Sequence, residues 1–349
     1  MSTDRRMIQT SEGRSYDASQ NRYIILLIIG FLLLCGLVIL SLTSGNYKTS
    51  LQDIMQTFIN SDSNQQVYNV VIFSRIPRLL AAMIIGAALS VSGLVFQDIF
   101  VNHMASPDIL GVSSGAGFGA SMAIFLGFGY VYVWLFSFIS GIVSVCITVL
   151  VSSFFRQDAG NSITLILSGI IIGGLMNSAI GLLKFLSNDA QLSSITYWLL
   201  GGLYNTNYSQ LKIAVPIIAV GILFLYLLRW KIILLRNGTM DARVHGVNAQ
   251  RIKFVAISLA TLITAMSVSV GGNIGWIGLA VPNMMKVVLK DDNKHIMPLV
   301  ILYGMAFTVL SDLFARTISM SEIPIGIITG IMGSIIFVIV LLVRRIYYE

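Results

Sequence analysis

The sequence contains little charge. Asp, Glu, Lys and Arg make up 11% of its 349 residues, whereas apolar residues make up 56% and the mean hydropathy is +0.85. A soluble domain carries about 25% charged residues. This chain cannot cover a folded surface with polar groups, so its composition excludes a soluble domain and predicts a polytopic membrane protein.

Cysteine and histidine are also rare. The two cysteines, Cys35 and Cys146, lie inside apolar runs without metal-ligand spacing, so we interpret both as helix residues. The three histidines, His103, His245 and His295, fall in predicted loops on the inner side of the membrane. This pattern predicts no metal site.

Catalytic motifs are missing as well. The chain contains no G-x-x-x-x-G-K-[ST] phosphate loop, no H-E-x-x-H and no pair of carboxylates in the middle of a span. Asp312 comes nearest, but it stands four residues before Arg316 and is expected to pair with it. A proton- or sodium-coupled carrier normally needs a buried acidic group. Energy for transport is therefore expected to come from another chain.

The N-terminus has no cleavable signal pattern. Residues 1–22 are polar, and the next twenty, YIILLIIGFLLLCGLVILSL, are uncharged. This run is longer than the apolar region of a signal peptide and no A-x-A site follows it, so we expect it to remain as the first span. The chain is thus divided into a polar cytoplasmic tail at 1–22 and a transmembrane domain at 23–345.

Uncharged runs bounded by polar residues predict about ten membrane crossings in an all-α fold. They lie near 23–44, 75–97, 107–128, 131–155, 161–186, 208–229, 251–271, 274–290, 295–317 and 324–344. Two assignments rest on glycines. The 47 uncharged residues at 109–155 turn at GFGY (127–130), and Gly271-Gly272 divide the run at 254–285. Nine crossings remain an alternative.

The basic residues indicate the orientation. The net charge of +7 is dispersed between apolar runs, which argues against a nucleic-acid surface. With ten crossings, 16 of the 22 Lys and Arg residues fall on the side of both termini. The positive-inside rule makes that side cytoplasmic. The six basic residues left on the outer side are Lys48, Arg75, Arg78, Lys184, Lys212 and Arg316.

Three of these six are arginines, and two share an R-x-x-R unit. Arginines at the ends of spans can simply reach the lipid headgroups. Alternatively, Arg75, Arg78 and Arg316 form an electropositive outer rim that pairs with carboxylates on a partner. Both interpretations stay open on the residues alone.

One inner connection is long enough to form structure of its own. It reads KIILLRNGTMDARVHGVNAQRIK (231–253) and is basic. The apolar residues Met240, Val244 and Val247 recur in it at helical spacing, and Gly238 and Gly246 act as breaks. The segment either lies on the membrane surface or forms two short helices that present a knob to a cytoplasmic partner.

Glycine and proline predict interrupted helices near Pro107, Gly271-Gly272, Pro282 and Pro324. Broken helices at membrane depth are tolerated only where protein or a water-filled cavity satisfies the backbone. The pattern favours a transporter over an inert anchor. A secondary transporter for a small solute and a membrane-embedded enzyme are the alternatives, and the missing acid–base and metal constellations argue against the enzyme.

An ordered series of motifs resembles the permease subunits of ABC importers for iron–siderophore, haem and vitamin B12. The series includes RIPRLLAAMIIGAALSVSGLVFQ (75–97), NHMASPDILGVSSGAGFGA (102–120), ITYWLLGGL (195–203), GGNIGWIGLAVPN (271–283) and EIPIGIITGIMGSIIF (322–337). The resemblance covers roughly residues 20–345. It implies a ten-span type II importer fold in a bacterial inner membrane and import of an iron chelate, with a ferric siderophore first and haem or cobalamin as alternatives.

The resemblance also implies partners. They are a second permease copy or a paralogue, two ATPase subunits that carry ATP and Mg, and an extracytoplasmic substrate-binding protein, whereas this chain carries no cofactor and binds no nucleic acid. Glutamates of the binding protein pair with the outer arginines at 75, 78 and 316. Residues 231–250 dock on the ATPase as coupling helices, and the inner gate is formed by Asn102, Met104, Asn161 and Ser162.

Two positions depart from the family pattern. The family usually has N-P-L-A-x-P where this chain has NHMASP, so His103 replaces a proline beside the gate. The family also usually has V-P-H where this chain has Asn283 after Pro282. These departures leave the family resemblance intact and put the roles of the two positions in doubt.

Overall fold

The computed structural model describes the chain except for residues 1, 46, 48, 60–64, 156–160, 238–241, 243, 290–294, 320 and 349. The side chains of residues 2–19, 56–59, 161–162, 237 and 346–348 also lie outside the description.

Every regular element in the described part of the chain is helical. The first half contains α1 (Ser2–Thr43), α2 (Leu51–Ile59), α3 (Gln65–Asn69), the π-helical turn η1 (Val70–Arg75), α4 (Ile76–Phe100), the 3₁₀ turn η2 (Pro107–Leu110), α5 (Val112–Phe125) and α6 (Tyr130–Phe154). The second half contains α7 (Asn161–Leu186), α8 (Asp189–Leu199), α9 (Tyr208–Asn237), α11 (Ala249–Gly271), α12 (Ile277–Val288), α13 (Ile296–Thr317) and α14 (Ile325–Tyr348).

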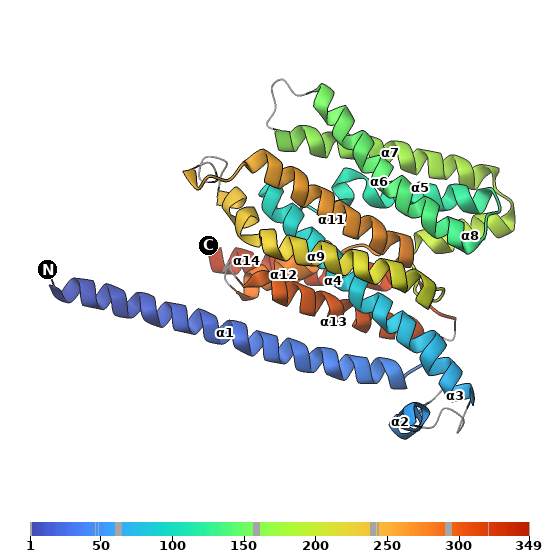
Figure 1. Ribbon diagram of the computed structural model, residues 1–349, viewed down its shortest axis with the longest axis horizontal. Helices are drawn as coiled ribbons and strands as arrows, with labels where there is room; N and C mark the ends of the chain where they lie inside the picture. Colours follow the sequence, from blue (N-terminus) through green and yellow to red (C-terminus); the bar gives the residue numbers. More distant parts are fainter. Residues whose placement is uncertain are drawn as a thin grey trace.

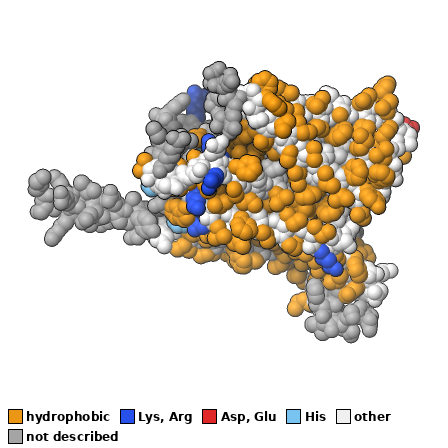
Figure 2. Space-filling model, turned by 45° about the horizontal axis from the view of Figure 1, so that its top comes forward, with side chains coloured by type: hydrophobic (Ala, Val, Ile, Leu, Met, Phe, Trp, Pro, Cys, Tyr) orange, Lys and Arg blue, Asp and Glu red, His pale blue; other side chains and the backbone are white. Residues whose placement is uncertain are grey.

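The helix lengths agree with the predicted crossings. Eight of the described helices are long and apolar enough to cross a membrane, and α5 and α12 are shorter apolar helices. Apolar side chains cover most of the face shown in Figure 2, and some are almost fully exposed, such as Phe185 at 85%. Because water would disfavour so large an apolar surface, lipid is its natural surrounding. The predicted all-α polytopic fold is confirmed.

The bundle has two distinct ends. Both termini lie at one end, which we call the terminal end, and α2, α3 and α8 lie at the other, which we call the arginine end (Figure 1). The turn after α4 belongs to the terminal end, because the His103 ring nitrogen Nδ1 is 3.4 Å from Nη2 of Arg344 near the C-terminus. A chain that crosses the membrane an even number of times has both termini on the same side, as the predicted ten crossings require.

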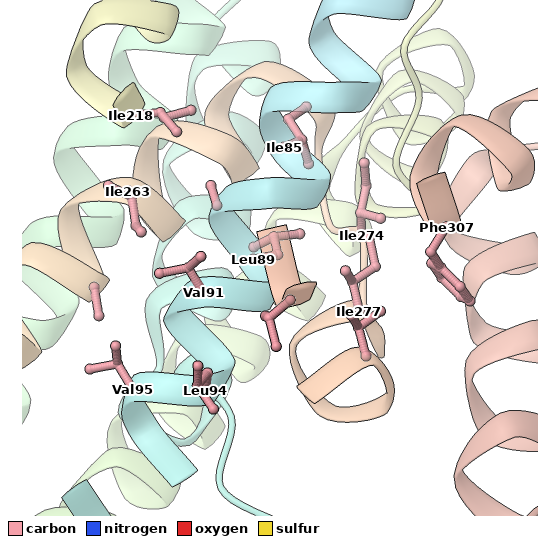
Figure 3. Packing of buried hydrophobic residues seen from close by; sticks show 14 of the residues in the cluster. Ile85, Leu89, Val91, Leu94, Val95, Ile218, Ile263, Ile274, Ile277 and Phe307 are labelled. Carbon is pink, nitrogen blue, oxygen red and sulfur yellow. The ribbon is translucent and has the colours of Figure 1, made fainter. Parts of the chain in front are cut away.

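Helix α4 occupies the centre of the bundle. Its apolar side chains pack against α9, α11, α12 and α13, as the cluster around Leu89 and Val91 shows (Figure 3). Two glycines allow this close approach: a Cβ atom at Gly86 would lie 2.2 Å from the Gly304 carbonyl oxygen, and one at Gly93 would lie 1.9 Å from the Gly278 carbonyl oxygen. Small residues at such crossings are typical of helix packing in lipid.

The predicted helix breaks are confirmed at three of four places. Helix α11 ends at Gly271, Pro107 begins η2, and Pro324 directly precedes α14. The prediction at Pro282 was wrong, because α12 runs through this proline without interruption. Proline removes one backbone donor from a helix, and here a side chain of α4 donates to the carbonyl that is left without its donor.

Candidate functional site

The arginine end contains a buried ionic network. Arg78 Nε lies 2.7 Å from Asp312 Oδ1, and Arg316 Nε lies 3.2 Å from Asp312 Oδ2. One carboxylate thus joins the start of α4 to the end of α13, and its side chain is 1% exposed. The expected pairing of Asp312 with Arg316 is confirmed.

The end of α1 and the residues just after it bind the guanidinium groups of Arg75 and Arg316. Arg75 donates hydrogen bonds to the carbonyl oxygens of Leu42 and Tyr47 and to the Thr49 hydroxyl. Gly45 has a φ of +147°, and a Cβ atom there would lie 3.2 Å from Arg75 Nη2. The backbone therefore passes close over this arginine, whose exposed fraction is 5%.

Arg316 is held in the same way. Its Nη2 donates to the Ser41 carbonyl at 2.8 Å and to the Ser41 hydroxyl at 2.7 Å, and its Nη1 donates to the Ser44 carbonyl at 3.2 Å. The structure thus brings the three predicted docking arginines together and pairs each of them inside the chain. Sequence alone did not indicate this burial, and docking to a partner stays a prediction.

Arg78 differs from the other two because its second partner is accessible. Its Nη1 lies 2.7 Å from Glu322 Oε2, and the Glu322 side chain is 37% exposed. Residue 323 fixes the backbone beside it, since the Ile323 N–H donates to the Ala315 carbonyl at 2.9 Å. Glu322 is therefore the accessible member of the network, on a segment anchored to α13.

The pair borders a cavity of about 610 Å³. Its walls come from the α5–α6 turn, α8, the loop before α9 and residues 322–325, and its aromatic lining consists of Phe128, Tyr130, Tyr197, Trp198 and Tyr204. Burial raises the pKa of the Tyr204 phenol, and Tyr197 and Glu322 raise it further. This tyrosine is thus a neutral hydroxyl at physiological pH, and the cavity combines ring faces with one neutralised ion pair.

The predicted inner gate lies in a tight turn at the terminal end. Val101 ends α4 in the left-handed conformation, and Asn102 Oδ1 accepts a hydrogen bond of 2.9 Å from the Met104 N–H. Asn102 and Met104 are both exposed, Met104 at 58%. Asn161 and Ser162 form the start of α7, and their side chains lie outside the described residues.

A second buried ion pair lies just beneath this turn. Lys286 Nζ on α12 is 2.9 Å from Asp98 Oδ1 on α4, with side-chain exposures of 1% and 5%. The predicted span at 75–97 ends one residue before Asp98, and Lys286 falls inside another predicted span at 274–290, so the sequence pattern did not indicate this pair. A signal was present in the sequence: Asp98 and Lys286, which have opposite charges, each stand at the predicted cytoplasmic edge of an apolar run.

Two amides complete this cluster. Gln97 Nε2 donates to the Gly278 carbonyl at 3.3 Å. Within α12 this carbonyl would accept from the N–H of residue 282, but proline has no N–H. Asn283 Nδ2 donates to the His103 carbonyl and to the Leu279 carbonyl, both at 2.8 Å. The two positions that depart from the family pattern therefore contact each other.

The predicted coupling segment is described in part. Gly238 and Met240 lie outside the described residues. Val244 is 83% exposed, and Gly246 has a φ of +70° with open space around it. The Val247 N–H donates to the Ala242 carbonyl at 2.8 Å. The described part is thus a folded projection at the terminal end. No cluster of three or more potential metal ligands occurs among the described residues.

Comparisons with known proteins agree with this architecture. The model of the FecCD transport family matches residues 31–344. The chain is 33% identical to the molybdate import system permease protein of Haemophilus influenzae, over 88% of this chain and 92% of that protein. It is 32% identical to the hemin transport system permease protein of Yersinia pestis, over 91% and 96% of the two chains.

A solved metal-chelate type ABC transporter in an inward-facing conformation has the same fold. Its TM-score is 0.81 at 30% identity, and the match covers 90% of this chain and 98% of that one. The family match covers most of the chain, including the arginine end and the turn after α4. The chain therefore belongs to the FecCD transport family and is a permease of an ABC importer.

Proposed function

We propose that this permease imports an iron chelate, with a ferric siderophore as the first candidate. The observation that carries the proposal is the aromatic cavity of about 610 Å³ at the arginine end. Ring faces suit a bulky organic ligand. Binding a bare oxyanion would favour free cationic groups or hydrogen-bond donors, and here Arg78 is already paired with Glu322.

The relatives differ in the chemical class of their cargo. The hemin and metal-chelate transporters carry an organic ligand around a metal, whereas the relative named for molybdate carries an oxyanion. The aromatic lining favours the first group. Molybdate is the second candidate, and family membership argues against the alternative of a secondary transporter without an ATPase.

The transporter that we propose is an assembly in a bacterial inner membrane. Both termini face the cytoplasm, as the distribution of basic residues predicts. Two permease copies, or this chain and a paralogue, associate with two ATPase subunits, which bind ATP and Mg. The exposed side chain of Val244 and the open space at Gly246 support a role for residues 231–250 in ATPase docking.

A binding protein docks at the arginine end in this proposal. Arg75 and Arg316 are enclosed by backbone carbonyls, so they supply positive potential and hold the segment after α1. Arg78 is the group that can change partner. An incoming carboxylate would replace Glu322 on the Arg78 guanidinium, and docking is therefore an exchange of carboxylates.

The cavity is tested with one aromatic substitution and a matched control. Tyr204→Ala removes a cavity ring that is 52% exposed, and Phe73→Ala removes a ring that is 61% exposed at the same end but outside the cavity. Uptake of a radiolabelled ferric siderophore by proteoliposomes with the full transporter should fall with Tyr204→Ala only. Equal effects of both substitutions would contradict the role of the cavity.

A further inference from the structure

Helices α4 and α12 share a buried ion pair that neither docking nor ATPase coupling uses. Lys286 and Asp98 are almost completely buried, and their charged atoms are 2.9 Å apart. A buried charge that loses its partner is strongly unfavourable. The positions of α4 and α12 at this level are therefore tied to each other.

The surroundings make Asp98 essential to this arrangement. Arg236 on α9 and Arg344 on α14 are close enough for their positive charges to act on Lys286. Asp98 supplies the opposite charge to Lys286 within hydrogen-bond distance. Neutralising Asp98 would leave Lys286 without its counter-charge among positive groups, which disfavours the charged lysine in this buried position.

Gln97 links the ion pair to the proline in α12. Its Oε1 accepts a hydrogen bond of 3.1 Å from Lys286 Nζ, while its Nε2 donates to the Gly278 carbonyl. That carbonyl has no helical donor because residue 282 is proline. A side chain of α4 thus completes the backbone hydrogen bonding of α12, which explains why α12 does not break.

Asn283 extends the cluster to the turn itself. Its Nδ2 donates to the His103 carbonyl, and His103 lies between Asn102 and Met104. The Oδ1 atom of Asn283 is buried without a hydrogen-bond partner. Helix α12 therefore contacts the chain on both sides of the left-handed residue Val101: before it at Asp98 and after it at His103.

We propose that Asp98, Lys286, Gln97 and Asn283 form a latch that positions the turn at 101–105. The latch makes the exposure of Asn102 and Met104 depend on the position of α12. Helix α12 follows α11, which begins at Ala249, within the last residues of the predicted coupling segment, and has Asn248 as its N-cap. These four are positioning residues, and the inference rests on the proposed gate role of the turn.

The test measures the turn directly. Met104→Cys is introduced with Cys35→Ala and Cys146→Ala into the full transporter in proteoliposomes, and labelling by a membrane-impermeant maleimide is timed. Asp98→Asn should change the labelling rate of Met104→Cys about tenfold. Loss of a hydrogen bond to a charged group shifts the equilibrium between positions of the turn by a factor of that order. Lys286→Arg should keep the wild-type rate, and the charge exchange Asp98→Lys with Lys286→Asp should restore it at least in part.

Phe155→Cys provides the control site, because this residue is 68% exposed directly after α6 and lies outside the segment proposed to dock on the ATPase. Its labelling should be the same with and without Asp98→Asn. Should Asp98→Asn not assemble, Asn283→Ala is used. It removes the hydrogen bond to the turn and one hydrogen bond within α12 but leaves the ion pair in place, and it should change Met104→Cys labelling in the same direction. Unchanged labelling at Met104→Cys in an assembled Asp98→Asn or Asn283→Ala transporter would overturn the latch.

The same data separate the latch from the gate. If labelling of Met104→Cys responds to Asp98→Asn but never changes during ATP turnover, the latch positions the turn and the proposed gate role is wrong. If labelling changes during ATP turnover but not with either latch substitution, the gate role stands and the latch is wrong.

Discussion

Glu322→Gln should strengthen docking of the binding protein. In the resting permease Glu322 occupies Arg78 at 2.7 Å, so an incoming carboxylate has to compete with it. Glutamine keeps the size of the side chain and removes the charge. The competition should therefore weaken, and the docking affinity should rise.

The magnitude follows from the exposure of the two partners. The Arg78 side chain is 10% exposed and the Glu322 side chain 37%, so the pair lies between a solvated surface pair and a buried one. A surface pair contributes about 0–1 kcal/mol, and the upper limit applies here. A change of about 1 kcal/mol corresponds to a roughly fivefold lower Kd.

The assay is binding of the cognate substrate-binding protein to the permease–ATPase complex in nanodiscs, by biolayer interferometry at two salt concentrations. Asp189→Asn is the matched control, because it removes an exposed acidic residue from the same end without touching Arg78. It tests whether any loss of negative charge has the same effect. The gain for Glu322→Gln should shrink at high salt, where charges are screened.

An unchanged or weaker affinity of Glu322→Gln would refute the exchange. An equal gain in docking affinity with Asp189→Asn would show that the effect of Glu322→Gln comes from general electrostatic attraction and not from Arg78. If the wild-type complex itself fails to bind the protein, the proposed docking at this end is wrong, whatever Glu322 does.

Three other substitutions test separate parts of the account. Arg75→Gln should lower the thermal stability of the detergent-solubilised permease, because three acceptors at the end of α1 and just after it lose their donor; stability equal to wild type would contradict this role. Gly246→Glu should uncouple ATP hydrolysis from uptake while the permease still reaches the membrane, and unchanged uptake with unchanged ATPase co-purification would count against coupling at 231–250. Gly93→Ala should prevent stable assembly of the permease, because its Cβ atom would lie 1.9 Å from the Gly278 carbonyl oxygen; size-exclusion chromatography should show loss of the monodisperse peak, and wild-type behaviour would be inconsistent with the described α4–α12 packing.

The fold was predictable because a helix that crosses a bilayer needs about 20 consecutive, mainly apolar residues. Apolar runs of sufficient length predicted the crossings, and glycine pairs indicated where uncharged stretches divide. The ion pair of Asp312 and Arg316 was predictable too, since residues four apart face each other on a helix. These inferences need only local sequence.

The tertiary partners of the polar residues were not predictable in this way. The break expected at Pro282 was wrong because a side chain from α4, nearly two hundred positions away, supplies a hydrogen bond to the carbonyl that proline leaves without a donor. The burial of Arg75 depends on carbonyl groups at the end of α1 and in the turn after it. The pairing of Lys286 was not predictable because its partner, Asp98, stands at the end of another apolar run, nearly two hundred positions away.

Uptake by the reconstituted transporter distinguishes the candidate cargoes and the source of energy. Proteoliposomes with this permease, its ATPase and its binding protein are given either a radiolabelled ferric siderophore or radiolabelled molybdate, with ATP or with only a proton gradient. We expect accumulation of the ferric siderophore that requires ATP and the binding protein. Accumulation of molybdate alone would contradict the proposed cargo, and accumulation driven by the proton gradient without ATP would contradict the transport mechanism.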